Sequence, residues 1–320
     1  MAALANDSED EALEDLFGFN LNDCTGCDDS DDDASCAPHV PKRRVGIAVE
    51  RVAASSLSCA EFAARYSRPG VPVVLTGCAE GAHLTVDWWL AHHGDREVPL
   101  DVNSGGQVTC PLGPFLRGER HRTKYLRNLH LGDWFPGAAD DVGLPAAMGE
   151  NHLADEAKTP GNVPHTWRTW LELFICFEDC AGFPFLHRDI CHTHAYSLQI
   201  EGEKEFTLFA PDDARYVYVN GQSGFSGNRS SIPDVRAPDV FARFPLFQLA
   251  APSTVVIGPG DALFVPDGWW HTARCVSSGR PSVTLGGNFV DDANYARFID
   301  AFADYQAVRS LATVGASFIN

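Results

Sequence analysis

The chain has 320 residues, of which 45% are hydrophobic and 11% aromatic, so it is long enough to bury one substantial core or two smaller ones. Its formal charge of −19 is uneven, because residues 1–40 carry twelve Asp and Glu and no Lys or Arg, which leaves −7 for the rest (−19 minus −12). A negative body argues against non-specific binding to phosphate backbones. We therefore expect no nucleic-acid partner unless a basic run such as 41–45 or 116–124 provides a local patch.

Residues 1–44 are expected to form a disordered acidic tail, since their charges repel one another. An alternative for this segment is a zinc site built from Cys24, Cys27, Cys36 and His39, although nothing apolar surrounds these residues. No apolar segment reaches the ~20 residues needed to cross a bilayer, and the start of the chain is acidic. We expect no membrane contact, an intracellular location in the nucleus or the cytoplasm, and ten cysteines that are mostly reduced.

Residues 45–164 are expected to form a supporting region of helices and strands. Ser58, with Glu61 three residues later, predicts the start of a short helix. The run 68–78 reads as a turn followed by a buried strand, and 85–95 as a second helix that ends at Gly94. Trp88 and Trp89 are interpreted as core residues.

Residues 165–290 predict many short strands divided by Gly, Pro and Asp turns, which is typical of an all-β barrel or sandwich. We expect a tight hairpin near Glu201 and Gly202, another turn near Pro259 and Gly260, and a long loop at 220–240. The segment 294–312 predicts an amphipathic helix, and residues 301–320 are assigned to a C-terminal helical part.

Three residues predict a metal site. His187 and Asp189 are two residues apart, so on a strand their side chains point to the same face, and His271 follows a Pro/Gly turn far downstream. Two imidazoles and one carboxylate would hold ferrous iron on one side and leave positions open. His192 and His194 are rival ligands, of which His194 is expected beside the site or facing a substrate. Cys191 and Cys275 are expected to be buried packing residues.

Two stretches resemble the metal motifs of the Jumonji-C oxygenases. "LHRDICHTHAYSLQIEGEKEFTLFAP" at 186–211 is similar to their first motif, and "GDALFVPDGWWHTARC" at 260–275 resembles both their second motif and the general cupin pattern. The resemblance covers roughly 45–300. It implies a mainly β fold with flanking helices, the double-stranded β-helix or jelly-roll barrel. It also implies Fe(II), 2-oxoglutarate and O2.

The same resemblance indicates which residues would hold the cosubstrate. Lys204 can supply the cation that the distal carboxylate of 2-oxoglutarate needs when buried. Further candidate contacts are Asn288, Thr284, Tyr125 and Ser197. The chain departs from the family pattern at four positions: Asn128, Pro184, Ala195 and Tyr196.

The expected function is a 2-oxoglutarate-dependent dioxygenase that acts on a protein side chain, with hydroxylation favoured. The substrate is expected to be a protein or peptide, which a basic sequence would suit, and the oligomeric state is left open. One alternative is an N-demethylase of lysine or arginine. Others are a cupin-like binding protein without catalysis and a cupin-type metal isomerase, whose first motif would need His-x-His.

Overall fold

The computed structural model describes residues 45–101, 106–140, 142–180, 182, 185–219 and 228–317, with side chains to residue 307. The acidic tail with its possible zinc ligands and Pro184 lie outside these residues, as does part of the expected loop at 220–240. No described helix combines the length and the apolar character needed to cross a membrane.

The described strands form two main sheets and one small ribbon. The large sheet has the order β1-β2-β10-β7-β12-β6-β5 and is antiparallel except for the pair β1–β2. Its strands are β1 (Glu50–Ala53), β2 (Val73–Thr76), β5 (Leu126–His130), β6 (Glu172–Cys176), β7 (His194–Glu201), β10 (Asp261–Val265) and β12 (Ser282–Phe289). The small sheet has the order β11-β8-β9, formed by β8 (Lys204–Phe209), β9 (Ser253–Ile257) and β11 (Trp270–Cys275). The ribbon pairs β3 (Glu97–Leu100) with β4 (Val108–Pro111).

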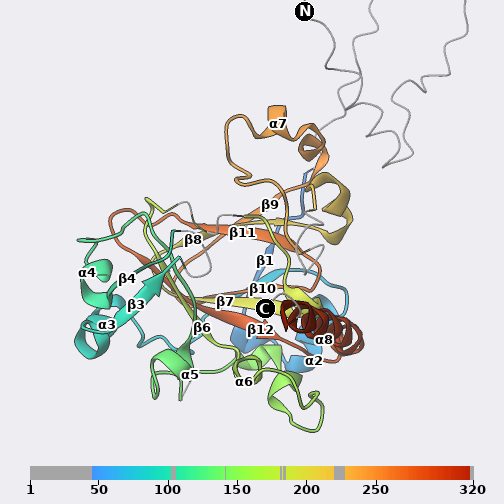
Figure 1. Ribbon diagram of the computed structural model, residues 1–320, viewed down its shortest axis with the longest axis horizontal. Coiled ribbons are helices and arrows are strands. Elements are labelled where there is room, and N and C mark those ends of the chain that lie inside the picture. The colour runs from blue at the N-terminus through green and yellow to red at the C-terminus, as the bar shows by residue number, and fades with distance from the viewer. Residues whose placement is uncertain are drawn as a thin grey trace, which may run out of the picture. The chain divides into compact units, whose positions relative to one another are not determined.

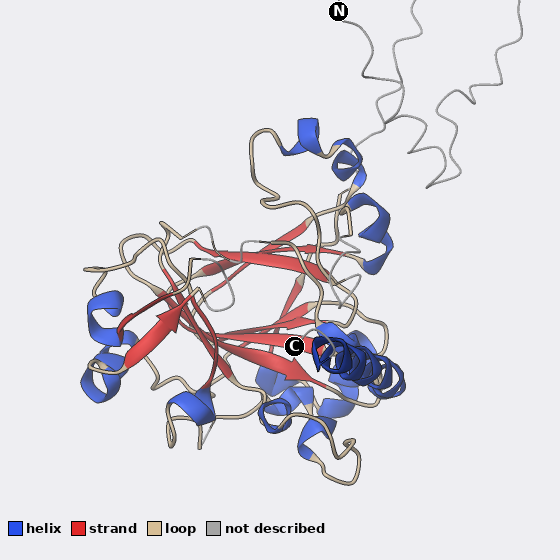
Figure 2. Ribbon diagram, in the orientation of Figure 1, coloured by secondary structure: helices blue, strands red, loops and turns tan. Residues whose placement is uncertain are grey.

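The two main sheets face each other as the layers of a jelly-roll sandwich (Figures 1 and 2). Alternation along β10 shows this: Leu263 and Val265 pack with β8, β9 and β11 between the sheets, whereas Ala262 and Phe264 join the core on the outer face. The expected mainly β fold with flanking helices is therefore confirmed. The two sheets are separate ladders among the described strands, so the sandwich is not closed into a barrel.

The expected hairpin at Glu201 and Gly202 is wrong, because β7 and β8 do not pair, whereas the expected turn at Pro259 and Gly260 is present. Gly202 and Gly260 have φ angles of 72° and 82°, which favour glycine. The first turn carries the chain from β7 in the large sheet to β8 in the small one, and the second carries it from β9 to β10. Turn residues indicate where a chain reverses, but the pairing partner depends on which sheet buries each apolar face.

The helices lie outside the sandwich (Figure 2). Ser58 and Glu61 form the expected capping box of α2 (Cys59–Phe62), which continues as a π turn over Ala63–Ser67. α3 (Val86–His93) ends at Gly94 as expected, with Trp89 buried and Trp88 stacked on His92. The other helices are α4 (Leu112–Leu116), α5 (Leu131–Trp134), α6 (His165–Arg168), α7 (Val240–Arg243) and α8 (Tyr295–Ser317). Short 3-10 turns lie at Ala54–Ser56, Ala146–Met148, His152–Ala154, Ile190–His192, Pro211–Tyr216 and Pro245–Leu249.

The supporting region and the sandwich are not separate in space. The strands β1, β2 and β5 all come from residues 45–164, yet they form both edges of the large sheet. Phe62 of α2 and Leu131 of α5 pack in the same core as Leu198 and Leu285, on the outer face of that sheet. This part of the chain therefore extends the large sheet at both edges and covers its outer face.

Candidate metal centre

A backbone pairing brings the two motifs together. His187 donates its N–H to the carbonyl of His271 at 3.1 Å, and His271 returns a bond to the carbonyl of His187 at 2.6 Å. Residues that exchange both hydrogen bonds of an antiparallel pair project their side chains on the same face. The two imidazole rings accordingly lie with their centroids 4.3 Å apart.

Asp189 completes the candidate ligand set from just beyond this pairing. His187 forms only isolated bridges, with His271 and Arg229, and Asp189 lies where the chain enters the 3-10 turn Ile190–His192. The expected strand through 187–189 is thus limited to a bridge at His187. An Oδ2 oxygen of Asp189 is nevertheless 3.7 Å from Nε2 of His271, and one ligand atom from each of the three residues lies within 4.8 Å of the others.

This donor set fits a catalytic divalent metal. It offers two nitrogen atoms and one oxygen atom that lie within 4.8 Å of one another, and it contains no thiolate. Burial lowers the pKa of His187 well below its usual value, and the neighbouring His271 lowers it further, so the ring is neutral and able to bind a metal. Three clustered ligands with open positions suit ferrous iron better than a closed structural zinc site, which needs four.

The triad lines a small pocket of about 90 Å³ between the two sheets. Lys204, the first residue of β8, also lines this pocket and is only 2% exposed. Its Nζ donates to the phenol oxygen of Tyr125 at 3.2 Å and lies over the rings of Tyr125 and Phe174. Because burial disfavours the charged amine, the pKa of Lys204 is lowered, and an anion brought beside it would be stabilised.

The other predicted cosubstrate residues also line this pocket. Thr284 donates its hydroxyl to Oε1 of Gln199 at 2.9 Å, and Asn288 donates its amide to the hydroxyl of Thr193 at 2.9 Å. Ser197 faces the same space from β7. The structure therefore brings all eight predicted site residues around one pocket, while their roles stay predictions.

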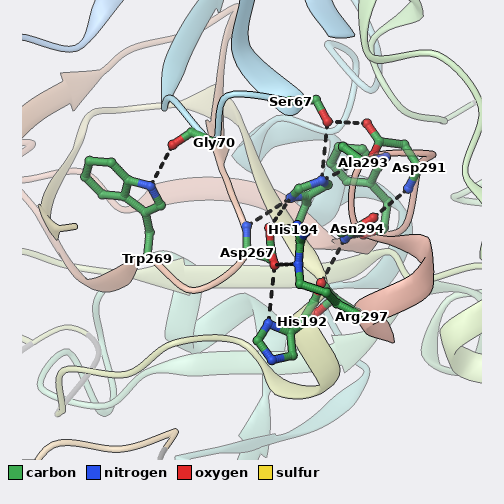
Figure 3. A network of polar contacts seen from close by, with 12 residues as sticks. Ser67, Gly70, His192, His194, Asp267, Trp269, Asp291, Ala293, Asn294 and Arg297 are labelled. Atoms are coloured by element: carbon green, nitrogen blue, oxygen red, sulfur yellow. Dashed lines mark hydrogen bonds and ion pairs between the residues drawn. The ribbon is translucent and has the colours of Figure 1, made fainter. Parts of the chain in front are cut away.

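His192 and His194 do not lie in this pocket, so the expectation that His194 stands beside the site or faces a substrate is wrong. Figure 3 shows both histidines in a separate polar network around Asp267. Nδ1 of His194 accepts the backbone N–H of Asp267 at 2.9 Å, and its Nε2 is 3.3 Å from Asp291. Strand alternation explains the difference, because His194 begins β7 with its side chain on the face opposite Ala195 and Ser197.

Asp267 is the centre of this network, which joins three segments of the chain. It accepts two hydrogen bonds from Arg297 of α8, at 2.9 and 3.0 Å, and its Oδ2 lies 3.3 Å from Nδ1 of His192. Asn294 adds a bond to the backbone carbonyl of His192 at 2.8 Å. His192 lies between Asp189 and β7, and Asp267 lies four residues before His271, so the network links the two metal motifs to each other and to α8.

The two cysteines near the motifs differ in their surroundings. Cys275 is buried as expected and packs with Cys176, Cys180 and Tyr125. A hydrogen bond from Cys176, together with Ser277 and Lys204, lowers its pKa to about 6 against the opposing effect of burial. Cys191 is only half-buried, because it lies in the 3-10 turn with a φ of 52°.

Two pocket residues escaped the sequence interpretation, Glu172 and Asn128. Asn128 was noted as a departure from the family pattern, but it was not assigned to the site. The amide of Asn128 donates to Oε2 of Glu172 at 3.0 Å. A signal was available in "LELFICF", where Glu172 is the one charged residue in an apolar strand.

Comparison with known proteins identifies the family. A family described as "Cupin-like domain" matches residues 115–289, which include the whole triad and Lys204. The chain belongs to the cupin-like domain family. The resemblance to the Jumonji-C and cupin-like oxygenases is thereby confirmed at the level of the family.

Individual relatives of this cupin-like protein carry different names. It is 36% identical to "tRNA wybutosine-synthesizing protein 5" of Gallus gallus over 62% of this chain and 65% of that protein. It is 26% identical to "tRNA wybutosine-synthesizing protein 4" of Neurospora crassa, over 81% of this chain and 22% of that protein. A third relative, "Bifunctional arginine demethylase and lysyl-hydroxylase psr-1" of Caenorhabditis elegans, is 23% identical over 70% of this chain and 57% of that protein. The chain thus spans less than two thirds of each of these proteins.

Proposed function

We propose that the protein is an Fe(II)- and 2-oxoglutarate-dependent oxygenase. The observation that carries this proposal is that one pocket holds both a His187–Asp189–His271 cluster and a buried lysine, Lys204, which contacts no carboxylate among the described residues. A metal site with open positions and a separate buried cation match the two ends of a keto acid that chelates through one end and carries a carboxylate at the other.

Different residues of the pocket would bind the metal and the cosubstrate. His187, Asp189 and His271 would hold the iron, and Lys204 with the Tyr125 phenol would receive the distal carboxylate of the cosubstrate. When bound, iron with 2-oxoglutarate and dioxygen supplies the oxidising power to attack a C–H bond. Phe174, Phe206 and Ala273 line the same pocket and make part of its wall apolar.

For the substrate we propose a protein side chain, with hydroxylation favoured over N-demethylation. The printed name of the Caenorhabditis elegans relative combines a lysyl-hydroxylase and an arginine demethylase, which supports a protein substrate and leaves both reactions open. A basic peptide would suit the net negative body of the chain. A nuclear or cytoplasmic location belongs to the same proposal.

An RNA substrate is the second candidate, because two relatives are named for tRNA wybutosine synthesis. Against it, the basic run 116–124 is largely neutralised by neighbouring acids. Arg117 pairs with Glu119 at 2.7 Å, and Arg122 pairs with Asp179 at 2.7 Å. These ion pairs favour the protein substrate over a phosphate backbone.

Turnover of the cosubstrate tests the proposed activity. The full chain, supplied with ferrous iron, 2-oxoglutarate and oxygen, should form succinate, and candidate peptides or tRNA should accelerate it. Lys204→Ala should raise the KM for 2-oxoglutarate at least about tenfold, because it removes a charge-assisted bond, and Lys204→Arg should recover part of the loss. Lys158→Ala, which removes a lysine beside His152 away from the pocket, is the matched control. Absence of succinate from a folded, iron-loaded protein would favour a non-catalytic binding protein.

A further inference from the structure

Glu172 is a carboxyl group in the pocket that the proposed activity does not use. It is the first residue of β6, and alternation along this strand places it on the same face as Phe174, toward His187 and Asp189. Its Oε2 accepts a hydrogen bond from the amide of Asn128 at 3.0 Å, and the indole of Trp170 provides another.

No cation compensates this carboxyl group among the described residues. The groups that act on it are Asn128, Trp170 and Asp189, of which the last is itself an anion. The pKa of Glu172 is raised to about 7. Burial is the main cause and the negative charge of Asp189 adds to it, while the hydrogen bonds from Asn128 and Trp170 lower the pKa in part. The group is therefore poised to accept a positive charge from outside the chain.

The charge balance of the pocket with iron and 2-oxoglutarate bound also indicates that Glu172 needs a cation from outside the chain. The two positive charges of ferrous iron and the one of Lys204 would be matched by Asp189 and by the two carboxylates of 2-oxoglutarate. Glu172 is not needed for this balance, so its ionised form would remain an uncompensated buried charge, which is costly. A cationic group of the substrate would remove that cost.

Glu172 faces the pocket beside a partly apolar wall. It lines the pocket together with Asn128, Phe174 and Gly287. Its strand partner Gly286 has no space for a side chain, since a Cβ there would lie 2.8 Å from the carbonyl oxygen of Tyr196. On the other side, the ladder between β5 and β6 shifts register near Asn128, whose φ is 56°. This irregularity places the exposed side-chain amide of Asn128 at the pocket. The carbonyl oxygen of that amide can accept a further hydrogen bond.

We propose that Glu172, supported by Asn128, is a specificity-determining acid that binds a guanidinium or ammonium group of the substrate. This inference rests on the proposed oxygenase function and narrows its substrate to a molecule with a cation near the carbon that reacts. The Glu172 carboxylate would pair with the cation, and the Asn128 carbonyl would accept one further N–H bond.

Small probes test the inference without turnover. The full chain is loaded with Mn(II) and 2-oxoglutarate, and the paramagnetic relaxation of probe protons is measured for methylguanidinium and n-butylammonium. N-methylurea and butan-1-ol serve as neutral isosteres. We expect the cations to bind next to the metal, and their affinity to rise with pH as Glu172 loses its proton. The neutral isosteres should bind weakly at every pH.

Glu172→Gln should weaken binding of both cations at least about tenfold and leave the neutral probes unchanged. Glu178→Gln is the matched control, because Glu178 is an exposed acid that follows the same strand and lies 3.8 Å from Arg122. Equal cation affinity in Glu172→Gln and in the unchanged protein would overturn the inference. That result would leave the proposed function standing if 2-oxoglutarate still binds. Failure to bind Mn(II) and 2-oxoglutarate would instead count against the function itself.

Discussion

Glu172 and Lys204 show that burial shifts the pKa values of two pocket residues in opposite directions. The pKa of the Glu172 carboxyl group is raised to about 7, and the pKa of the Lys204 amine is lowered, because the same low-polarity space disfavours both charges. Each group therefore gains from a ligand of the opposite charge. This places an anion near Lys204 and a cation near Glu172.

Replacement of Glu172 by Gln should change the stability of the ligand-free protein in a pH-dependent way. The pKa of Glu172 is higher in the folded state than its usual 4.5, so the folded chain holds the proton more tightly and loses stability as pH rises from about 4.5 to about 7. Urea unfolding should show Glu172→Gln to be more stable by about 2 kcal/mol near pH 8 and equal to the unchanged protein near pH 4.5. A difference that does not vary with pH would contradict this.

The sequence was sufficient to predict the metal triad but not Glu172. The spacing of His187 and Asp189, with His271 after a Pro/Gly turn, predicted that the three side chains converge, and one backbone pairing between His187 and His271 brings them together. Glu172 lies in an apolar strand, where the residue pattern alone does not tell which face meets the pocket. That assignment requires the pairing of β6 with β12 and β5.

At the scale of elements, two glycine turns carry the chain between the sheets, and one polar network joins the metal motifs. Most of the strands could be predicted from apolar alternation, since each expected strand after residue 165 is present except the one through 187–189. Their pairing could not, because β7 and β8 are consecutive in sequence yet lie in different sheets. Which strands pair with each other depends on which apolar side chains each face of a sheet buries.

The turn at Gly202 should tolerate a side chain much less well than the turn at Gly279. Both residues have positive φ angles, 72° and 74°, but a Cβ at Gly202 would lie 2.6 Å from Oγ of Ser277 and 2.9 Å from the carbonyl of Pro281, whereas Gly279 has nothing within 4 Å. Gly279→Ala should cost about 1 kcal/mol of stability, and Gly202→Ala about 3 kcal/mol or more. Thermal unfolding would measure both, and equal losses would contradict the role given to the turn.

Asp267→Asn should loosen the metal site through the network of Figure 3. Asparagine keeps the size of the side chain but removes the charge that holds Arg297 by two bonds and lies 3.3 Å from Nδ1 of His192. We expect a loss of stability of about 1–3 kcal/mol and a fall in ferrous affinity of about tenfold. Asp234→Asn, at an exposed acid 3.9 Å from Arg236, is the control. Metal affinity equal to that of the control would show that the network does not position the ligands.

At the scale of the whole molecule, charge distribution separates the two candidate substrate classes. The described body pairs its basic run with acids, including Lys124 with Asp101 at 3.1 Å. The charge outside residues 1–40 is −7. Both features weaken long-range attraction to a phosphate backbone and favour a positively charged partner.

The full chain should therefore bind unfractionated tRNA only weakly, with a dissociation constant above about 10 µM near physiological salt. Fluorescence anisotropy over a series of salt concentrations would measure this, and the slope of affinity against salt should be shallow because few phosphates are contacted. Tight binding, with a steep dependence on salt, would move the second candidate substrate to first place. A basic peptide of similar size provides the comparison.

We propose that His187, Asp189 and His271 hold ferrous iron while Lys204 anchors 2-oxoglutarate in the same pocket. Anaerobic titration of the full chain with iron and then 2-oxoglutarate tests this proposal through the visible charge-transfer band of the metal chelate. We expect a band that appears with both ligands, vanishes in His187→Ala and needs more 2-oxoglutarate to develop in Lys204→Ala. No band in the folded protein, or a band that survives His187→Ala unchanged, would contradict it.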